Sequence, residues 1–212
     1  MIEEIDITLV FTEPLLGSQP GDEEIFTTYV LGKRNEIDIK HGQNGNGTEE
    51  VALLPAEDDL ELKRSVFLRA ENGDFVLSNH VVRGFFKYAA GALKYMEGTH
   101  SQKLTMYKHK ISQFVWIDPR FIVLRPAGAM YHVDRPLRRE TPFGPATALA
   151  SSEALPANTS CKFTVQLLGG GISAAHIEEW LKYGKYQGLG QWRGASYGRF
   201  RFDMSKPRQA PL

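Results

Sequence analysis

The residues best suited to bind a ligand lie in a glycine-rich run from Gly184 to Phe202, where five glycines separate aromatic and cationic side chains. Glycine tolerates positive φ and close backbone approach, so such a run can present N–H groups to a bulky anion. Trp192 and Arg193 add a π-face and a positive charge, which are the groups that single-stranded nucleic acids contact. The alternative is a tight helix-to-strand turn that needs glycine only for its geometry.

A second set of cationic residues lies in the segment Arg135-Pro-Leu-Arg138-Arg139, which begins a proline-rich connection that reaches Pro145. Prolines at 136, 142 and 145 predict irregular structure, because each removes a backbone donor and fixes φ. We therefore expect the three arginines on an exposed, semi-rigid loop. Guanidinium groups pair with phosphates through two parallel hydrogen bonds, so this loop is the second candidate for binding nucleic acid.

A helix is predicted from Ser78 or Asn79 to about Glu97, with Gly98 as its stop. Six apolar residues at 3–4 spacing form its core face: Val82, Phe85, Phe86, Ala89, Leu93 and Met96. Arg83, Lys87 and Lys94 share another side, where they would either contact phosphates or form an ordinary solvated surface.

Catalytic chemistry has weaker support. Metal-independent RNA cleavage needs a base and a group that stabilises developing charge. His80 and His132 are the best-placed histidines for that role, although a surface or capping histidine is the simpler interpretation of each. The sequence contains no zinc-ligand spacing, Walker loop or nucleophile elbow, and its Gly188-Leu-Gly190 follows a helix instead of preceding one, so NAD binding is disfavoured. We expect no metal, no cofactor and a protein that is not an enzyme.

The distribution of charge along the chain is uneven, although the net charge is zero. Residues 1–62 hold 15 acidic and 3 basic residues, a net charge of −12, and residues 63–212 balance them at +12. This asymmetry favours a polyanion-binding body with a separate acidic segment. That segment could shield the basic face or contact the basic face of a neighbouring copy.

The single cysteine, Cys161, excludes an internal disulfide and is expected as a buried thiol. No apolar run approaches the roughly 20 residues of a membrane span, and no signal peptide is recognised. We expect a cytoplasmic protein with no membrane partner.

Strands are predicted at residues 5–11, 65–69, 75–77, 111–117, 121–124 and 159–168, with a last strand ending at Phe202. A second helix is predicted from Ser173 to Tyr183. Helices that alternate with strands in this way indicate an α+β fold.

Four stretches together resemble the RAMP superfamily, the repeat-associated proteins that form backbone subunits of CRISPR effector complexes. They are an opening strand with a Pro-Leu-x-Gly turn at 5–17, a strand-turn-strand-helix at 66–86, a strand entry at 152–165, and a terminal glycine-rich loop at 188–200. The chain is also similar to uncharacterised proteins of phages and prophages.

The resemblance implies a ferredoxin-like, RRM-type antiparallel sheet with helices on one face and loop or strand insertions. It implies one domain over 1–204, with an acidic insertion at about 18–62, a basic loop at about 132–146 and a tail at 205–212. The basic-Gly pair of the family falls on Arg83-Gly84. The carboxylate with which some backbone subunits cut RNA is absent, since Lys63-Arg64-Ser65 occupies its neighbourhood.

These observations predict a non-catalytic protein that binds a single strand of RNA, or of DNA, as a homo-oligomer or as a subunit of a ribonucleoprotein, with RNA favoured by the resemblance. A phage protein that mimics or inhibits CRISPR components and a metal-independent endoribonuclease are the alternatives. The expected contacts with nucleic acid are Arg83, Lys87, Lys94, Arg135, Arg138, Arg139, Tyr186, Gly188, Gly190, Trp192, Arg193 and Arg199.

Overall fold

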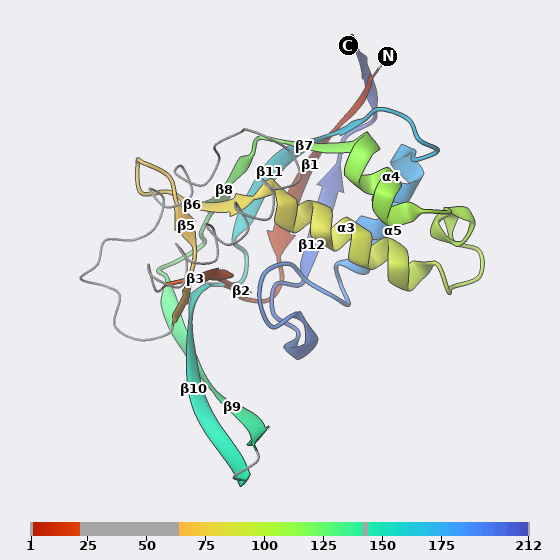
Figure 1. Cartoon of the computed structure of the whole chain (residues 1–212). Coiled ribbons are helices and arrows are strands. Elements are labelled where there is room, and N and C mark those ends of the chain that lie inside the picture. The colour runs from red at the N-terminus through yellow and green to blue at the C-terminus, as the bar shows by residue number, and fades with distance from the viewer. Residues whose placement is uncertain (1, 22–63, 142–143, 212) are drawn as a thin grey trace, which may run out of the picture. The chain divides into compact units, whose positions relative to one another are not determined.

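The computed structural model (Figure 1) describes residues 2–21, 64–141 and 144–211, and at 64 and 136–149 it describes the backbone alone. The predicted acidic insertion lies outside the described residues from position 22 onward. The chain forms two compact units. Unit 1 contains Met1–Leu15, Val76–Ala129 and Leu155–Leu212, and unit 2 contains Leu16–Phe75 and Met130–Ala154.

Unit 1 is a ferredoxin-like βαββαβ fold, as predicted. Its strands follow the spatial order β12-β1-β11-β8, and the pairs β12–β1, β1–β11 and β11–β8 are all antiparallel. The elements in chain order are β1 (Ile2–Phe11), α3 (Asn79–Leu93), β7 (Val115–Asp118) with β8 (Phe121–Arg125), β11 (Ser160–Leu167), α5 (Ala174–Tyr183) and β12 (Phe200–Met204). A short strand, β6 (Phe75–Ser78), pairs with β8 through residues 76–78.

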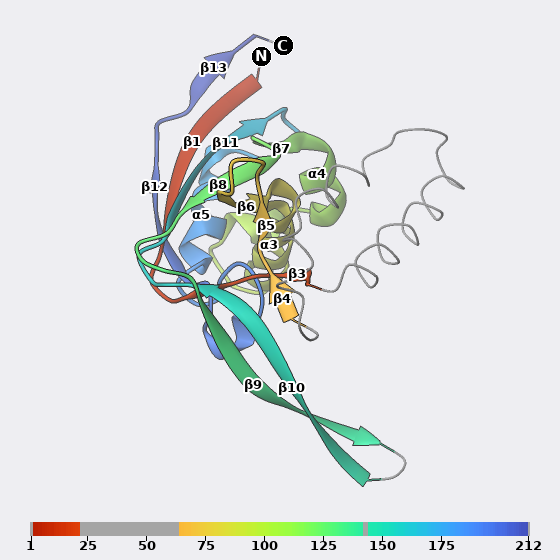
Figure 2. The ribbon, with the colours of Figure 1, turned by 90° about the vertical axis from the view of Figure 1, so that its left-hand side faces the viewer.

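The core of unit 1 lies on the side of the sheet that carries the helices. Alternate residues of β1 (Ile5, Ile7, Leu9 and Phe11) are fully buried, whereas those between them are only partly buried. Figure 2 shows α3, α4 (Tyr107–Phe114) and α5 on one side of the sheet. The strict alternation of β1 therefore separates a buried apolar face from a polar open face. Cys161 of β11 is buried as predicted, and burial raises the pKa of its thiol to about 12.

Both predicted helices of unit 1 form. Five of the six expected core residues of α3 are buried, and the sixth, Met96, is exposed because the helix ends at Leu93. Ser173 caps α5 through a capping box with His176. The predicted strand at 111–117 is wrong for its first half: residues 111–114 complete α4, and only β7 is extended. The short helix η2 (His100–Lys103) precedes α4.

The segment predicted as a tail contains a further strand, β13 (Arg208–Ala210), which pairs with residues 2–4 of β1. Arg208 forms ion pairs with Glu4 and Asp6 on the open face of the sheet. The Arg208 side chain, followed by Thr164, holds the pKa of the Asp6 carboxyl below its ordinary value.

Unit 2 contains a sheet of order β10-β4-β3, in which β9 also pairs with β10. Its elements are β3 (Gln19–Pro20), β4 (Arg64–Val66), β5 (Leu68–Arg69), β9 (Tyr131–Thr141) and β10 (Gly144–Leu155), and the two-residue strand β2 (Leu15–Leu16) spans the boundary between the units in sequence. Glu153 of β10 is buried and accepts hydrogen bonds from the Phe67 amide (2.8 Å) and the Arg69 guanidinium (2.7 Å).

The predicted irregular basic loop is wrong, because residues 131–141 and 144–155 form the long hairpin β9–β10. Pro136 lies opposite Leu149 within it. An outer strand tolerates proline because the N–H groups on its open side need no strand partner.

Candidate nucleic-acid interface

Three tyrosines of unit 1 form a continuous row across two helices. Tyr88 comes from α3, Tyr183 ends α5, and Tyr186 follows in the glycine-rich run. Their ring centres are 6.3 Å apart for Tyr88–Tyr183 and 6.2 Å apart for Tyr183–Tyr186. Tyr88 is 45% exposed and Tyr186 is 61% exposed, so the row, which we call the tyrosine row, is open to a ligand.

A cation lies over each end of the tyrosine row. The guanidinium carbon of Arg193 is 5.4 Å from the centre of the Tyr88 ring, and the ammonium of Lys185 is 4.9 Å from the centre of the Tyr186 ring. Burial, and then the neighbouring Tyr88, raises the pKa of the Tyr183 phenol, which therefore stays neutral at physiological pH. Exposed aromatic rings interleaved with cations suit a strand that stacks its bases and leaves its phosphates near positive charge.

The glycine-rich run closes on itself by tight backbone packing. A Cβ added at Gly188 would overlap the backbone of Gly198, and one at Gly184 would overlap the Phe200 ring. The Leu189 amide donates to the Gly198 carbonyl (2.9 Å), and the Gly198 amide donates to the Pro14 carbonyl (2.8 Å). Gly188 is therefore required for this packing, and its predicted contact with a ligand stays a prediction. Gly194, by contrast, has open space where a Cβ would stand.

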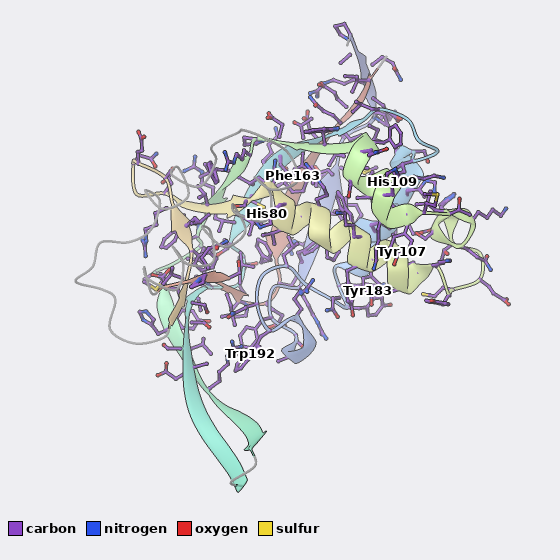
Figure 3. All side chains as sticks on the ribbon, in the orientation of Figure 1. His80, Tyr107, His109, Phe163, Tyr183 and Trp192 are labelled. Carbon is purple, nitrogen blue, oxygen red and sulfur yellow. The ribbon has the colours of Figure 1, made fainter. Side chains whose placement is uncertain are left out.

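Trp192 lies at the outer turn of this run, just before the short helix η3 (Arg193–Ala195). Its φ of 56° is left-handed, and its ring is 5.9 Å from the ring of Tyr197. The side chain is only partly exposed. Figure 3 labels Trp192 on this loop and Tyr183 at the end of α5. Gly190 also has positive φ, at 77°, and Arg199 is partly buried.

The basic residues predicted on α3 are close to Tyr88 in the sequence, but they lie on another side of the helix. Arg83 and Lys87 are one turn apart and partly buried, and Lys94 is exposed just after the last helical residue. Tyr88 is one residue past Lys87, about 100° around the helix. The structure thus divides α3 into a cationic side and an aromatic side.

Among the predicted arginines of unit 2, the structure describes the side chain of Arg135 alone. Arg135 is only 7% exposed, so it is unsuited to meet a phosphate directly. Arg138 and Arg139 lie on β9, opposite Thr147 and Ala146 of β10. Their side chains lie outside the described part of the structure.

The histidines predicted as weak catalytic candidates are both exposed, His80 on α3 and His132 on β9 (Figure 3 labels His80). Sequence reasoning missed a pair of neighbouring histidine rings, His100 and His176, with centres 5.5 Å apart. His176 serves the capping box of α5, since the Ser173 backbone amide donates to its Nδ1 (3.3 Å), which also lies 3.0 Å from the Ser173 hydroxyl. That contact assigns His176 to helix capping.

Sequence reasoning also missed Tyr88 and Tyr183. A signal for Tyr183 was present, because residues three apart at a helix end share a face and Tyr186 is three residues later. Tyr88 gave no such signal, since 95 residues separate it from Tyr183 and only the packing of α3 against α5 brings the rings together.

No protein-family model matches the sequence, and no curated protein matches it either. Among solved structures, the fold is similar to that of a chain in the cryo-EM structure of the Type III-B Cmr-beta bound to cognate target RNA, with a TM-score of 0.51 and 8% sequence identity. This similarity shows a shared fold. It covers 98% of this chain but 60% of the other, so this chain spans less than two thirds of its neighbour's length. None of the helices in the described ranges has the length and apolar character that a bilayer crossing requires.

Proposed function

We propose that this protein binds single-stranded RNA, without cleaving it, as a subunit of a ribonucleoprotein. The tyrosine row is the observation that carries the proposal. Two of its rings are about half exposed or more, and Arg193 and Lys185 lie over its ends. A duplex keeps its bases paired and stacked, whereas a single strand can place them on aromatic side chains, so the row favours unpaired nucleic acid.

The open face of the unit 1 sheet is poorly suited to RNA, and this favours binding on the side of the sheet that carries the helices. In RRM-type sheets, aromatic residues on the strands stack the bases. Here the outward positions of β1 include Glu4 and Asp6, which hydrogen-bond Gln166 and Thr164 of β11. Arg208 is ion-paired with both carboxylates. These satisfied acidic groups would repel phosphates, whereas the tyrosine row carries cations.

The choice of RNA over DNA is supported by the fold, because the similar chain belongs to a structure described as bound to cognate target RNA. The stacking chemistry of the row accepts either polymer, since every base has a π-face. A direct comparison of oligouridylate and oligodeoxythymidylate of equal length therefore belongs in the test.

The experiment is fluorescence anisotropy of a labelled oligouridylate with the wild-type protein and a Tyr88→Ala/Tyr186→Ala variant. Loss of two stacking sites should weaken binding by at least about 30-fold, since each stacked base contributes about 1–3 kcal/mol. Tyr95→Ala is the matched control, because Tyr95 is 86% exposed and contributes no ring to the row. Equal affinity of the wild type and the double variant, or equal affinity for single-stranded and duplex RNA, would overturn the proposal.

The same preparations separate the alternatives. RNA that is cut in the presence of EDTA, with cutting abolished by His80→Ala or His132→Ala, would favour a metal-independent endoribonuclease. A protein that binds no RNA but co-purifies with CRISPR components would favour the protein-contact alternative. Carried-over nucleic acid, visible as a raised absorbance ratio of 260 to 280 nm, supports the proposal before any binding assay.

A further inference from the structure

Three cations converge on the side of α3 away from the tyrosine row. Arg83 and Lys87 lie one helical turn apart, and Lys108 of α4 is close enough for its charge to act on Lys87. We call Arg83, Lys87 and Lys108 the cation cluster. In the described part of the chain, none of the three forms an ion pair with a carboxylate.

This arrangement is electrostatically costly in the free protein. Burial lowers the pKa of the Lys87 ammonium, and the charges of Arg83 and Lys108 lower it further. Burial also lowers the pKa of Arg83, whose Nε is buried and has no hydrogen-bond partner among the described residues. Like charges held together without a counter-charge are relieved when an anion binds between them.

An exposed tryptophan fixes the position of Arg83. The Arg83 guanidinium carbon lies 5.3 Å from the centre of the Trp116 ring on β7, and the Trp116 indole N–H donates to the Gln113 carbonyl (3.2 Å). Trp116 is 49% exposed, so the pair lies at the surface. A guanidinium that stacks its face on an aromatic ring still points its N–H donors outward in its own plane, where they can bind a phosphate.

The surface of α3 between the cation cluster and the tyrosine row is open at Gly84. A Cβ added there would meet nothing within 4 Å. The other glycine of α3, Gly91, is covered because the Tyr107 side chain of α4 packs against it. Gly84 is therefore an uncovered position on the exposed surface of α3.

We propose that the cation cluster binds a backbone phosphate of the same single strand whose bases stack on the tyrosine row, so that the strand crosses α3 at Gly84. Trp116 is a positioning residue that holds Arg83 for this contact, and Lys108 is a further phosphate ligand. The proposal rests on the single-strand binding proposed above. It adds a path for the strand across α3 and two residues, Trp116 and Lys108, that the sequence did not indicate.

The test compares labelled oligouridylates of about 4 and about 16 nucleotides, which bracket the site sizes of sequence-tolerant single-strand binders. The variant is Arg83→Gln/Lys87→Gln/Lys108→Gln. Losing contact with one phosphate lowers the slope of log affinity against log salt by about 0.7, so the slope for the long probe should fall by that amount. Between low salt and a fourfold higher concentration, wild-type affinity would then drop about 2.6-fold more than that of the variant.

Lys162→Gln/Arg201→Gln/Lys206→Gln is the matched control, because it removes the same charge from exposed positions on or near β11 and β12. It should leave the slope for the long probe close to that of the wild type. A control variant that loses as much slope as the cluster variant would show a general charge effect and overturn the assignment.

Gly84→Leu tests the crossing without altering charge. Replacing glycine inside a helix raises helix propensity, so the melting temperature should hold or rise. Affinity for the long probe should fall, whereas affinity for the short probe, which the tyrosine row can hold alone, should not. Unchanged long-probe affinity would refute the crossing.

The two proposals fail in different ways. A wild-type protein that binds neither probe contradicts the proposed function. A wild-type protein that binds the long probe, with the same slope and affinity in the cluster variant, contradicts the cation-cluster site and leaves the tyrosine row in place. Trp116→Ala should weaken long-probe binding, and Trp116→Phe, which keeps an aromatic face under Arg83, should restore most of it.

Discussion

The guanidinium of Arg193 lies over the ring of Tyr88, with 5.4 Å between the guanidinium carbon and the ring centre. Tyr88 belongs to α3, and Arg193 begins η3 of the glycine-rich run. This contact joins the glycine-rich run, which the sequence predicts as a binding site, to Tyr88, which the sequence did not predict as one. It also places the charge needed for a phosphate beside a ring able to stack a base.

Tyr88→Ala should weaken binding of a single-stranded RNA by about 5- to 150-fold, the range of one lost base stack. Arg193→Gln should cost affinity at low salt and less at high salt, because its contribution is electrostatic. Anisotropy titrations at two salt concentrations measure both effects. A Tyr88→Ala loss that vanishes at high salt would argue against stacking.

Trp192→Ala distinguishes a ligand contact from a packing residue. Trp192 is partly exposed and left-handed, so its removal should cost less stability than the about 3–5 kcal/mol of a core tryptophan. We expect weaker RNA binding with a nearly unchanged thermal melt. Both quantities must be measured on the same protein, since a collapsed melt, or unchanged binding, would make the loop a structural turn alone.

Gly188→Ala should lower the melting temperature, because its Cβ would overlap the backbone of Gly198 and the chain there cannot give way cheaply. Gly194→Ala serves as the control, since its Cβ would enter open space. A differential scanning calorimetry trace for each variant checks the difference. Equal melting temperatures would show that the segments around Gly188 and Gly198 are not packed against each other as described.

Stability should fall as pH drops below the ordinary His176 pKa of 6.5. Burial, followed by the nearby His100, lowers the pKa of His176 in the folded protein, although Glu179 opposes this. The unfolded chain therefore binds more protons between the folded pKa and 6.5, and protonation favours unfolding there. The contribution is complete above pH 6.5 and is lost progressively toward the folded pKa.

His176→Gln isolates this effect, because glutamine at the same position preserves a capping box with Ser173. Melting temperatures at about pH 8 and about pH 5.5 should differ less for the variant than for the wild type. A variant with the wild-type pH dependence would assign the sensitivity to other groups.

The charge asymmetry predicts concentration-dependent self-association. Residues 1–62 carry −12 and the rest of the chain +12, so opposite parts of two copies attract each other. A head-to-tail contact is heterologous and yields open filaments or rings. Light scattering should show larger species at low salt that dissociate at high salt, whereas a monomer at every concentration, with and without RNA, would contradict the prediction.

The sequence by itself determined the ferredoxin-like core of unit 1. The alternation of Ile5, Ile7, Leu9 and Phe11 specified a strand with one buried face, and the 3–4 spacing of apolar residues specified α3. Both patterns are local, because a strand repeats every two residues and a helix every 3.6. Ser173 likewise marked the start of α5, since helix capping involves only neighbouring residues.

Only the tertiary structure decided the elements and contacts that depend on distant partners. Residues 131–141 form a strand despite Pro136 because β10 pairs along one side of it, and residues 111–114 extend α4 although their side chains suit a strand. The tyrosine row and the cation cluster each unite residues from different helices, so no spacing in the sequence encodes them. The glycines of the run were recognised from sequence, but their tight contacts with Gly198 and Phe200 exist only after folding, because a close backbone approach is a property of two segments and not of one.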